Sequence, residues 1–156
     1  MKRQCSADIV IQAPPQAIWS IVSDVTRVGE WSGECRGCLW ESPGNHAEVG
    51  ARFRGRNRRG SMRWSRVNQF FSVREPEELV WRTMPGGLYS DSVEWRITLT
   101  PEGHGTRVSE SFEVIKLSKA VELFIGLILP AHKDRTADLG DDLRRLKTLV
   151  ESKSAA

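Results

Sequence analysis

The chain has 156 residues, the length of one domain, and we expect residues 1–156 to form a single domain. Hydrophobic residues make up 39% and charged residues 28%, a balance that excludes a disordered tail and a membrane protein. The net charge of +3 is too small for a polyelectrolyte. Six Trp and five Phe stand against one Tyr, which favours wide apolar walls over hydrogen-bonding aromatic rings.

The cellular context follows from the first residues and the cysteines. No apolar stretch typical of a signal peptide precedes the first strand, and three Cys cannot all pair. The longest apolar run, residues 120–131, is too short to span a bilayer, which needs about 20 residues. We therefore expect a cytoplasmic protein without stable membrane insertion.

The first elements are one strand and two short helices. Apolar and polar residues alternate over residues 6–12, as in a half-buried strand. Pro14 and Pro15 suit the start of a helix over residues 15–23, where apolar residues recur at helical spacing. Asp24, next to Ser23, is a typical N-cap for a second short helix over residues 25–30.

The middle of the chain alternates with period two and is punctuated by turn residues. The short connections predict antiparallel neighbours, because parallel pairs need long crossovers. The six predicted strands cover residues 35–41, 51–57, 62–74, 79–84, 88–100 and 105–115.

One helical stretch is predicted to close the chain, from Ser118 to Glu151, with a kink at Pro130. Its apolar stripe contains Leu139, Leu143, Leu146 and Val150. The element order predicts an α+β helix-grip fold: a seven-stranded curved antiparallel sheet wrapped around the long C-terminal helix. Two short helices lie between strands 1 and 2, and a cavity remains where side chains do not fill the space.

Five stretches in this order resemble a known family: residues 13–19 (Ala-Pro-Pro-Gln-Ala-Ile-Trp), 22–25, 30–32, 49–55 and 105–111. The chain is similar to the START-like (SRPBCC, Bet v 1-like helix-grip) superfamily, and within it to the polyketide cyclase/dehydrase and lipid-transport branch. The likeness runs over residues 7–151. It implies a hollow ligand-binding domain for a hydrophobic or amphipathic small molecule; the superfamily includes enzymes, carriers and receptors.

Glu110, His132 and Arg135 are the candidate polar residues of this cavity. Glu110 belongs to the inward series of its strand, where a carboxylate must be paired or have a raised pKa. A structural ion pair is the alternative. His132 extends the helix stripe toward the sheet, as a satisfied or partly exposed core histidine or as a polar anchor inside the pocket. Arg135 is a partner for Glu110 or a clamp for a ligand carboxylate. The catalytic residues are unknown, with Glu110 and His132 as candidates.

Aromatic and apolar side chains are expected to line the cavity; core packing is the stronger explanation for each Trp taken singly, but as a group the indoles suit a flat ring system. Trp31 is placed near the mouth, which the loop of residues 85–89 would help to form. With Tyr89 the only tyrosine, the walls offer few hydroxyls for chemistry, and we rank binding above catalysis. The predicted wall residues are Trp31, Trp64, Phe71, Trp81, Trp95, Phe112, Phe124 and Ile128.

Cys35 and Cys38 form a CxxC pattern in a predicted strand. Residues three apart in a strand face opposite sides, so we interpret the spacing as coincidence, with a zinc or redox site as the alternative. His46 and His104 fall in turns, and no metal triad is expected. The chain carries no nucleophile, phosphate-loop or dinucleotide motif, and we predict no metal and no cofactor.

A run of arginines is expected on the convex face of the sheet, solvated and paired with Glu75, Glu77 and Glu78. An acidic partner protein is the alternative use of this face. Nucleic acid is not expected, because no exposed aromatic residues or groove-entering element accompany the arginines. The run consists of Arg52, Arg54, Arg56, Arg58, Arg59, Arg63 and Arg66.

Three functional hypotheses follow. The first is binding or transport of a hydrophobic, ring-containing small molecule (lipid or polyketide-like) by a monomer or homodimer. The second is a cyclase/dehydrase-type enzyme, in which a positioned acid/base moves protons on a folded poly-ketone chain. The third is an interaction module that uses the arginine face.

Overall fold

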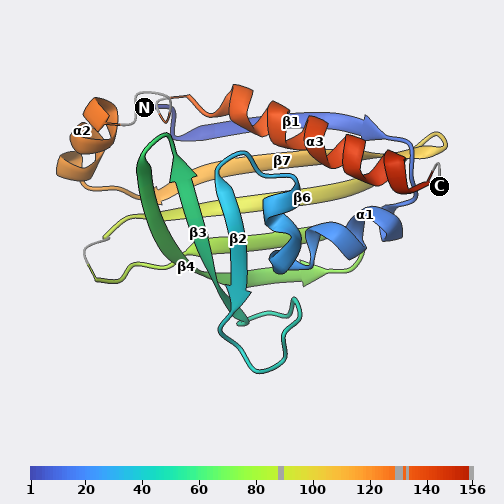
Figure 1. Cartoon of the computed structure of the whole chain (residues 1–156), viewed down its shortest axis with the longest axis horizontal. Coiled ribbons are helices and arrows are strands. Elements are labelled where there is room, and N and C mark those ends of the chain that lie inside the picture. Colours follow the sequence, from blue (N-terminus) through green and yellow to red (C-terminus); the bar gives the residue numbers. More distant parts are fainter. Residues whose placement is uncertain (88–89, 129–131, 133, 155–156) are drawn as a thin grey trace.

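The computed structural model describes residues 1–87, 90–128, 132 and 134–154. It contains one seven-stranded antiparallel sheet in the order β1-β7-β6-β5-β4-β3-β2. Figure 1 shows β2 and β3 running across the direction of β1 and β7, so the sheet is strongly curved. The strands are β1 (Gln4–Ile11), β2 (Cys35–Trp40), β3 (Arg52–Arg59), β4 (Met62–Arg74), β5 (Glu78–Thr83), β6 (Ser92–Glu102) and β7 (Gly105–Lys116).

All seven predicted strands are present, and β4 has the predicted bounds. The largest difference is at β6, which begins at Ser92 and not at residue 88. Ser92 donates its hydroxyl to the Thr83 carbonyl oxygen at 2.9 Å, which ties the start of β6 to the end of β5. Tyr89, part of the predicted cavity mouth, lies outside the described residues.

Two short helices connect β1 and β2: α1 (Pro15–Val22) and the 3₁₀-helix η1 (Val25–Glu30). Asp24 caps η1, as predicted, because its Oδ1 accepts the backbone N–H of Thr26 at 3.0 Å. α1 buries Ile18 completely against the core. These helices hold the turn into β2, and that turn carries residues of the site.

The sequence predicts one helical stretch over residues 118–151. The structure has two helices there, so the prediction is wrong in this respect. They are α2 (Lys119–Ile128) and α3 (Thr136–Ser154). Asp134 starts α3: its Oδ1 accepts the backbone N–H of Thr136 at 3.0 Å. Pro130, the predicted kink, lies outside the described residues. The break lets α2 project from the end of the sheet (Figure 1).

α3 packs on the concave face of the sheet, along β1 (Figure 1). The predicted apolar stripe is confirmed, since its four members are at most 2% exposed. Lys147 Nζ donates to the Val10 carbonyl oxygen at 2.7 Å, and Glu151 Oε1 accepts the backbone N–H of Gln12 at 2.9 Å. The helix-grip fold predicted from the sequence is therefore present.

Candidate functional site

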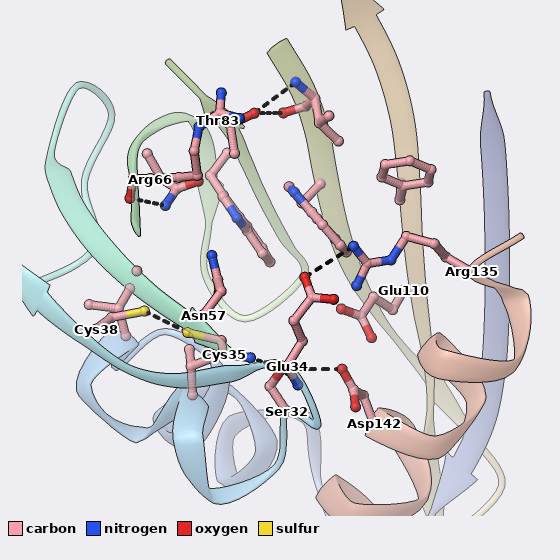
Figure 2. A pocket seen from close by; sticks show the side chains of 18 of the residues that line it. Ser32, Glu34, Cys35, Cys38, Asn57, Arg66, Thr83, Glu110, Arg135 and Asp142 are labelled. Atoms are coloured by element: carbon pink, nitrogen blue, oxygen red, sulfur yellow. Dashed lines mark hydrogen bonds and ion pairs between the residues drawn. The ribbon is translucent and has the colours of Figure 1, made fainter. Parts of the chain in front are cut away.

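A cavity of about 210 Å³ lies between the concave sheet, η1 and α3 (Figure 2). Its walls come from elements far apart in the sequence, because the curved sheet brings its middle strands toward the last helix. Six large aromatic side chains line it, which makes most of the wall apolar. They are Trp31, Phe53, Phe70, Trp81, Trp95 and Phe112.

Three of these rings form a continuous aromatic row because they are paired across neighbouring strands. Trp81 on β5 pairs with Trp95 on β6, which pairs with Phe112 on β7. The two indoles are stacked, 6.4 Å apart with planes 7° from parallel, and Trp95 lies 5.3 Å from Phe112. This row gives a ligand a flat wall to lie against.

Most of the predicted site residues meet in this cavity. Those among its lining residues are Trp31, Trp81, Trp95, Glu110, Phe112, His132 and Arg135. Trp31 is only 3% exposed, so it belongs to the inner wall and not to the mouth. That any of these residues binds a ligand stays a prediction.

Four predicted wall residues lie elsewhere. Trp64 meets the His132 ring edge-on at 5.9 Å but does not line the cavity. A register shift in β4 turns Phe71 outward, where the Arg82 guanidinium lies 4.5 Å from its ring centre. Phe124 and Ile128 are 57% and 44% exposed on α2.

Glu34, which the sequence analysis did not single out, is the charged centre of the site. Its carboxylate faces His132 Nε2 at 2.7 Å and accepts a hydrogen bond from Arg135 Nη1 at 3.2 Å. Arg59 Nη1 approaches it at 3.4 Å. Burial alone would raise the pKa of Glu34, but the hydrogen bond from His132 and the charge of Arg135 outweigh it and lower the pKa to about 2.

The Glu34 network changes the expected partner of Arg135. Pairing with Glu110 was one of two expected roles of Arg135, the other being a clamp for a ligand carboxylate; in the structure its ion pair is with Glu34 instead. Glu34 lies in the turn before β2, where no periodicity assigns its side chain to a face. The only sequence signal was its place two residues after residues 30–32, one of the family-like stretches.

Glu110 points into the cavity, as predicted, and is 3% exposed. Its Oε2 has no hydrogen-bond partner among the described residues. Burial first, and then the charge of Asp142, raise the pKa of Glu110 to about 8, although Arg135 opposes the shift. Figure 2 shows its carboxyl group beside Arg135. At neutral pH Glu110 is therefore mostly protonated and can donate a hydrogen bond.

Two further buried polar atoms of the cavity residues lack partners in the described part of the chain: Trp31 Nε1 and Arg135 Nε. The Arg135 guanidinium lies 5.1 Å from the Trp95 ring centre and 5.8 Å from that of Phe112. Ion pairing to Glu34 and ring contacts thus hold Arg135 in position, while its Nε–H remains available.

The orientations of Cys35 and Cys38 differ from the prediction. Cys35 and Cys38 do not face opposite sides, because both line the cavity and their sulfurs are 3.4 Å apart. A register shift between Cys35 and Gly37 puts an extra residue into β2 and reverses the side of the following residues. Within the described residues no group of three His, Cys, Asp or Glu side chains could hold a metal ion.

The arginine run divides between the two faces of the sheet. Arg59 turns inward and binds Asp138 of α3 at 2.8 Å. Arg66 pairs with Asp91 at 2.7 Å, and both line the cavity, so the prediction of a single convex row is wrong for these two arginines. The exposed members are Arg52, Arg54, Arg56, Arg58 and Arg63.

The predicted partners of the arginine run also differ. Arg54 binds Glu41 at 2.7 Å, the residue that directly follows β2. Glu78 instead pairs with Arg74 and Arg96, and Glu77 with Arg74. The acidic partners of Arg54, Arg59 and Arg66 thus come from the residue after β2, from α3 and from the residue before β6, and not from the turn before β5.

The sequence matches the family model described as polyketide cyclase/dehydrase and lipid transport over residues 2–151. The chain belongs to this family. The predicted resemblance to the polyketide cyclase/dehydrase and lipid-transport branch is thereby confirmed, and the predicted helix-grip fold is present. None of the curated protein sequences matches the chain. Among the described helices, none is long and apolar enough to cross a membrane.

Solved structures share the fold of this cyclase/dehydrase and lipid-transport family member. A protein from Thermus thermophilus superposes with a TM-score of 0.73 at 19% identity, covering 97% of this chain and 99% of that chain. The major latex-like protein of Panax ginseng gives 0.68 at 14%, covering 93% and 95%. A protein of the dynemicin biosynthetic locus gives 0.63 at 15%, covering 98% and 49%.

Proposed function

We propose that this family member binds or transports a hydrophobic, ring-containing small molecule that carries a hydrogen-bond acceptor oxygen. One observation carries the proposal. Three buried polar atoms, Trp31 Nε1, Glu110 Oε2 and Arg135 Nε, lack partners among the described residues, in a cavity whose walls are mostly aromatic. A buried polar group without a partner costs about 1–3 kcal/mol, and a ligand that satisfies it recovers that free energy.

The cavity volume limits the size of the ligand. A cavity of about 150 Å³ with apolar walls admits benzene. At about 210 Å³ the present cavity is only moderately larger. One or two rings therefore fit, and the stacked Trp81 and Trp95 give a planar ring system a matching surface.

The donors define the polar part of the ligand. The indole N–H of Trp31 and the Nε–H of Arg135 can only donate, and protonated Glu110 also donates. A carbonyl oxygen accepts from such donors without bringing a negative charge beside Asp142 and Glu34. We therefore propose a neutral aromatic ketone or a related oxygenated ring compound as the ligand class.

A matched pair of probes tests the proposal: 2-acetylnaphthalene and 2-ethylnaphthalene, which have nearly the same shape but differ in the carbonyl oxygen. Isothermal titration calorimetry should show the ketone binding about tenfold more tightly, the equivalent of one net hydrogen bond. Glu110→Leu should remove most of this preference, and Glu110→Gln, which keeps an N–H donor, should retain part of it. Glu113→Gln, on the exposed face of the same strand, is the control.

Equal affinities for the two probes in the wild-type protein would contradict the acceptor-oxygen requirement. Absence of binding for both would contradict the small-molecule proposal as a whole. Native mass spectrometry of the protein purified from its own cell gives an independent readout, because a retained ligand would appear as a fixed mass increment.

A cyclase/dehydrase-type enzyme is the second candidate, and the pKa of Glu110 favours it. A carboxyl group with a pKa of about 8 can hold and return a proton near neutral pH. Here Glu110 would protonate a ketone oxygen as an enolate carbon attacks the carbonyl. If Glu110→Gln abolishes turnover of a poly-ketone probe but leaves its affinity unchanged, the enzyme is supported; a loss of affinity alone supports the carrier.

The remaining expectations belong to the same proposal. Residues 1–156 act as one ligand-binding domain, monomeric or homodimeric, in the cytoplasm, with no nucleic-acid partner, cofactor or metal. The exposed arginines are not needed for it. Replacing Arg54 and Arg56 with Gln should leave binding of 2-acetylnaphthalene unchanged, whereas loss of an acidic partner protein with these variants would support the interaction-module alternative.

A further inference from the structure

Cys35 and Cys38 face the same side of β2 because of the register shift in that strand. Cys35 pairs with Asn57 of β3, and Cys38 pairs with Gly55. A step of three residues on β2 therefore matches a step of two on β3, and residues two apart in a strand share a face. The two thiols are brought to one face by the backbone and not by a chance side-chain rotation.

The separation of the sulfurs suits reversible bond formation. They are 3.4 Å apart, so forming a disulfide of about 2.05 Å needs an approach of only about 1.4 Å. Both sulfurs lie beside Gly55 on the facing strand: a Cβ at this position would be in van der Waals contact with Cys38 Sγ at 3.6 Å and with Cys35 Sγ at 3.7 Å. Since Gly55 has no side chain, none from this position stands between the sulfurs, and a small side-chain rotation can bring them together.

The two thiols differ in pKa and in exposure. The hydrogen bond from Cys38 lowers the pKa of Cys35, and hydrogen bonds with the backbone of Gly37 and Arg56 add to this, although burial and the charge of Glu34 oppose it. The contact with Cys35 and burial raise the pKa of Cys38. Cys35 is partly exposed and Cys38 is 5% exposed. Cys35 thus has the greater thiolate character and the better access, the two properties that decide which thiol reacts first.

We propose that Cys35 and Cys38 are a reversible dithiol–disulfide site in the cavity wall, which a hydroperoxide oxidises. The Cys35 thiolate attacks the terminal peroxide oxygen, so the O–O bond breaks, the sulfur becomes a sulfenic acid and an alcohol or water leaves. Cys38 then attacks the Cys35 sulfur, the S–O bond breaks and water leaves with the Cys38 proton. Two thiols are oxidised and one hydroperoxide is reduced; a cellular thiol reverses the reaction.

This site is independent of the proposed ligand, since its chemistry uses only the two cysteines. The third cysteine serves as an internal control. Cys5 is 6% exposed and lies on β1, at the opposite edge of the sheet from β2, which carries Cys35 and Cys38. The proposal therefore predicts selectivity among three thiols of one chain.

The experiment treats the purified full chain with a slight excess of hydrogen peroxide and measures the intact mass under non-reducing conditions. The expected result is the loss of two hydrogen atoms, a Cys35–Cys38 linkage in peptide maps, and full reversal by dithiothreitol. Cys5→Ser should give the same result. Free alkylation of both Cys35 and Cys38 after peroxide would overturn the proposal, as would a linkage that involves Cys5.

Single variants test the assigned order of reaction. With Cys38→Ser, peroxide should leave Cys35 as a sulfenic acid that dimedone labels, at least several-fold more than Cys38 is labelled in Cys35→Ser. Circular dichroism and thermal unfolding of each variant check that it is folded. Equal labelling of the two variants would overturn the assignment of Cys35 as the first thiol to react.

Discussion

The space between the sheet and α3 has a packed end and a hollow end, built from the same two elements. At the packed end Leu146 of α3 and Val108 of β7 are fully buried in one apolar cluster. Two residues further along β7, Glu110 faces the cavity, and one turn back along α3 Asp142 lines it. On both elements the inward position changes from apolar to acidic where the cavity begins.

The difference shows that apolar packing stabilises the fold at one end, whereas buried polar groups that need partners lie at the other end. The packed end has no need of a ligand, because apolar side chains fill it. The hollow end contains buried carboxyl groups whose charged forms are costly unless paired. Glu34 is paired and stays charged, whereas Glu110 has no partner at Oε2 among the described residues and takes up a proton.

Leu146→Ala, at the packed end, should have the largest effect. Leu146 is 0% exposed, and deleting buried methyl groups leaves a cavity. We expect the free energy of unfolding to fall by about 2–5 kcal/mol in urea denaturation. Leu39→Ala is the matched control, because Leu39 is 57% exposed and its loss should cost less than about 0.5 kcal/mol. A similar effect of the two substitutions would contradict the assignment of the packed end.

Glu110→Gln should change how stability depends on pH. The pKa of Glu110 is 4.5 in the unfolded chain and about 8 in the fold, so the proton is bound more tightly in the folded state. The stability that the Glu110 proton contributes is fully present below pH 4.5 and is lost as the pH rises through 8. In Glu110→Gln the free energy of unfolding should lack this pH-dependent decrease, which is on the order of 2–4 kcal/mol. Urea denaturation at a series of pH values measures it.

Glu113→Gln, the control on the outer face, should leave the pH dependence of wild type unchanged. Parallel stability curves for wild type and Glu110→Gln between pH 4.5 and 8 would mean that Glu110 is not buried as a neutral acid.

Glu34→Gln should show the opposite pH dependence. The pKa of Glu34 falls from 4.5 in the unfolded chain to about 2 in the fold. Its contribution is present above pH 4.5 and is lost as the pH falls toward 2. At pH 7 the substitution should cost on the order of 1–3 kcal/mol, and near pH 2 it should cost little. Glu48→Gln, on an exposed loop, is the control; a constant cost at all pH values would contradict the assignment.

Trp31→Phe should have the smallest effect, confined to affinity for the ketone probe. It keeps an aromatic ring but removes the indole N–H, so binding of 2-acetylnaphthalene should weaken about two- to threefold, and binding of 2-ethylnaphthalene should not change. Calorimetry measures both. Trp64→Phe, the same substitution beside the cavity, should change neither. Equal losses for the two probes would mean that Trp31 contributes shape and not a hydrogen bond.

The fold was largely predictable because its signals are local. Period-two alternation marked the seven strands, Asp24 marked the cap of η1, and the stripe ending at Val150 marked α3. The inward position of Glu110 followed from the same alternation. The signals failed where a local irregularity changed the face of a residue, as at the register shifts that bring Cys35 and Cys38 together and turn Phe71 outward.

By itself, the sequence determined the helix-grip architecture, the family and the inward acid of β7. Only the tertiary structure decided which charges meet. Glu34 comes from a turn and Arg135 from the residue before α3, 101 positions apart, so no periodicity relates them. Their pairing leaves Glu110 to be neutralised by its surroundings, because desolvation and distance depend on the whole fold. The chemistry of the cavity follows from that pairing.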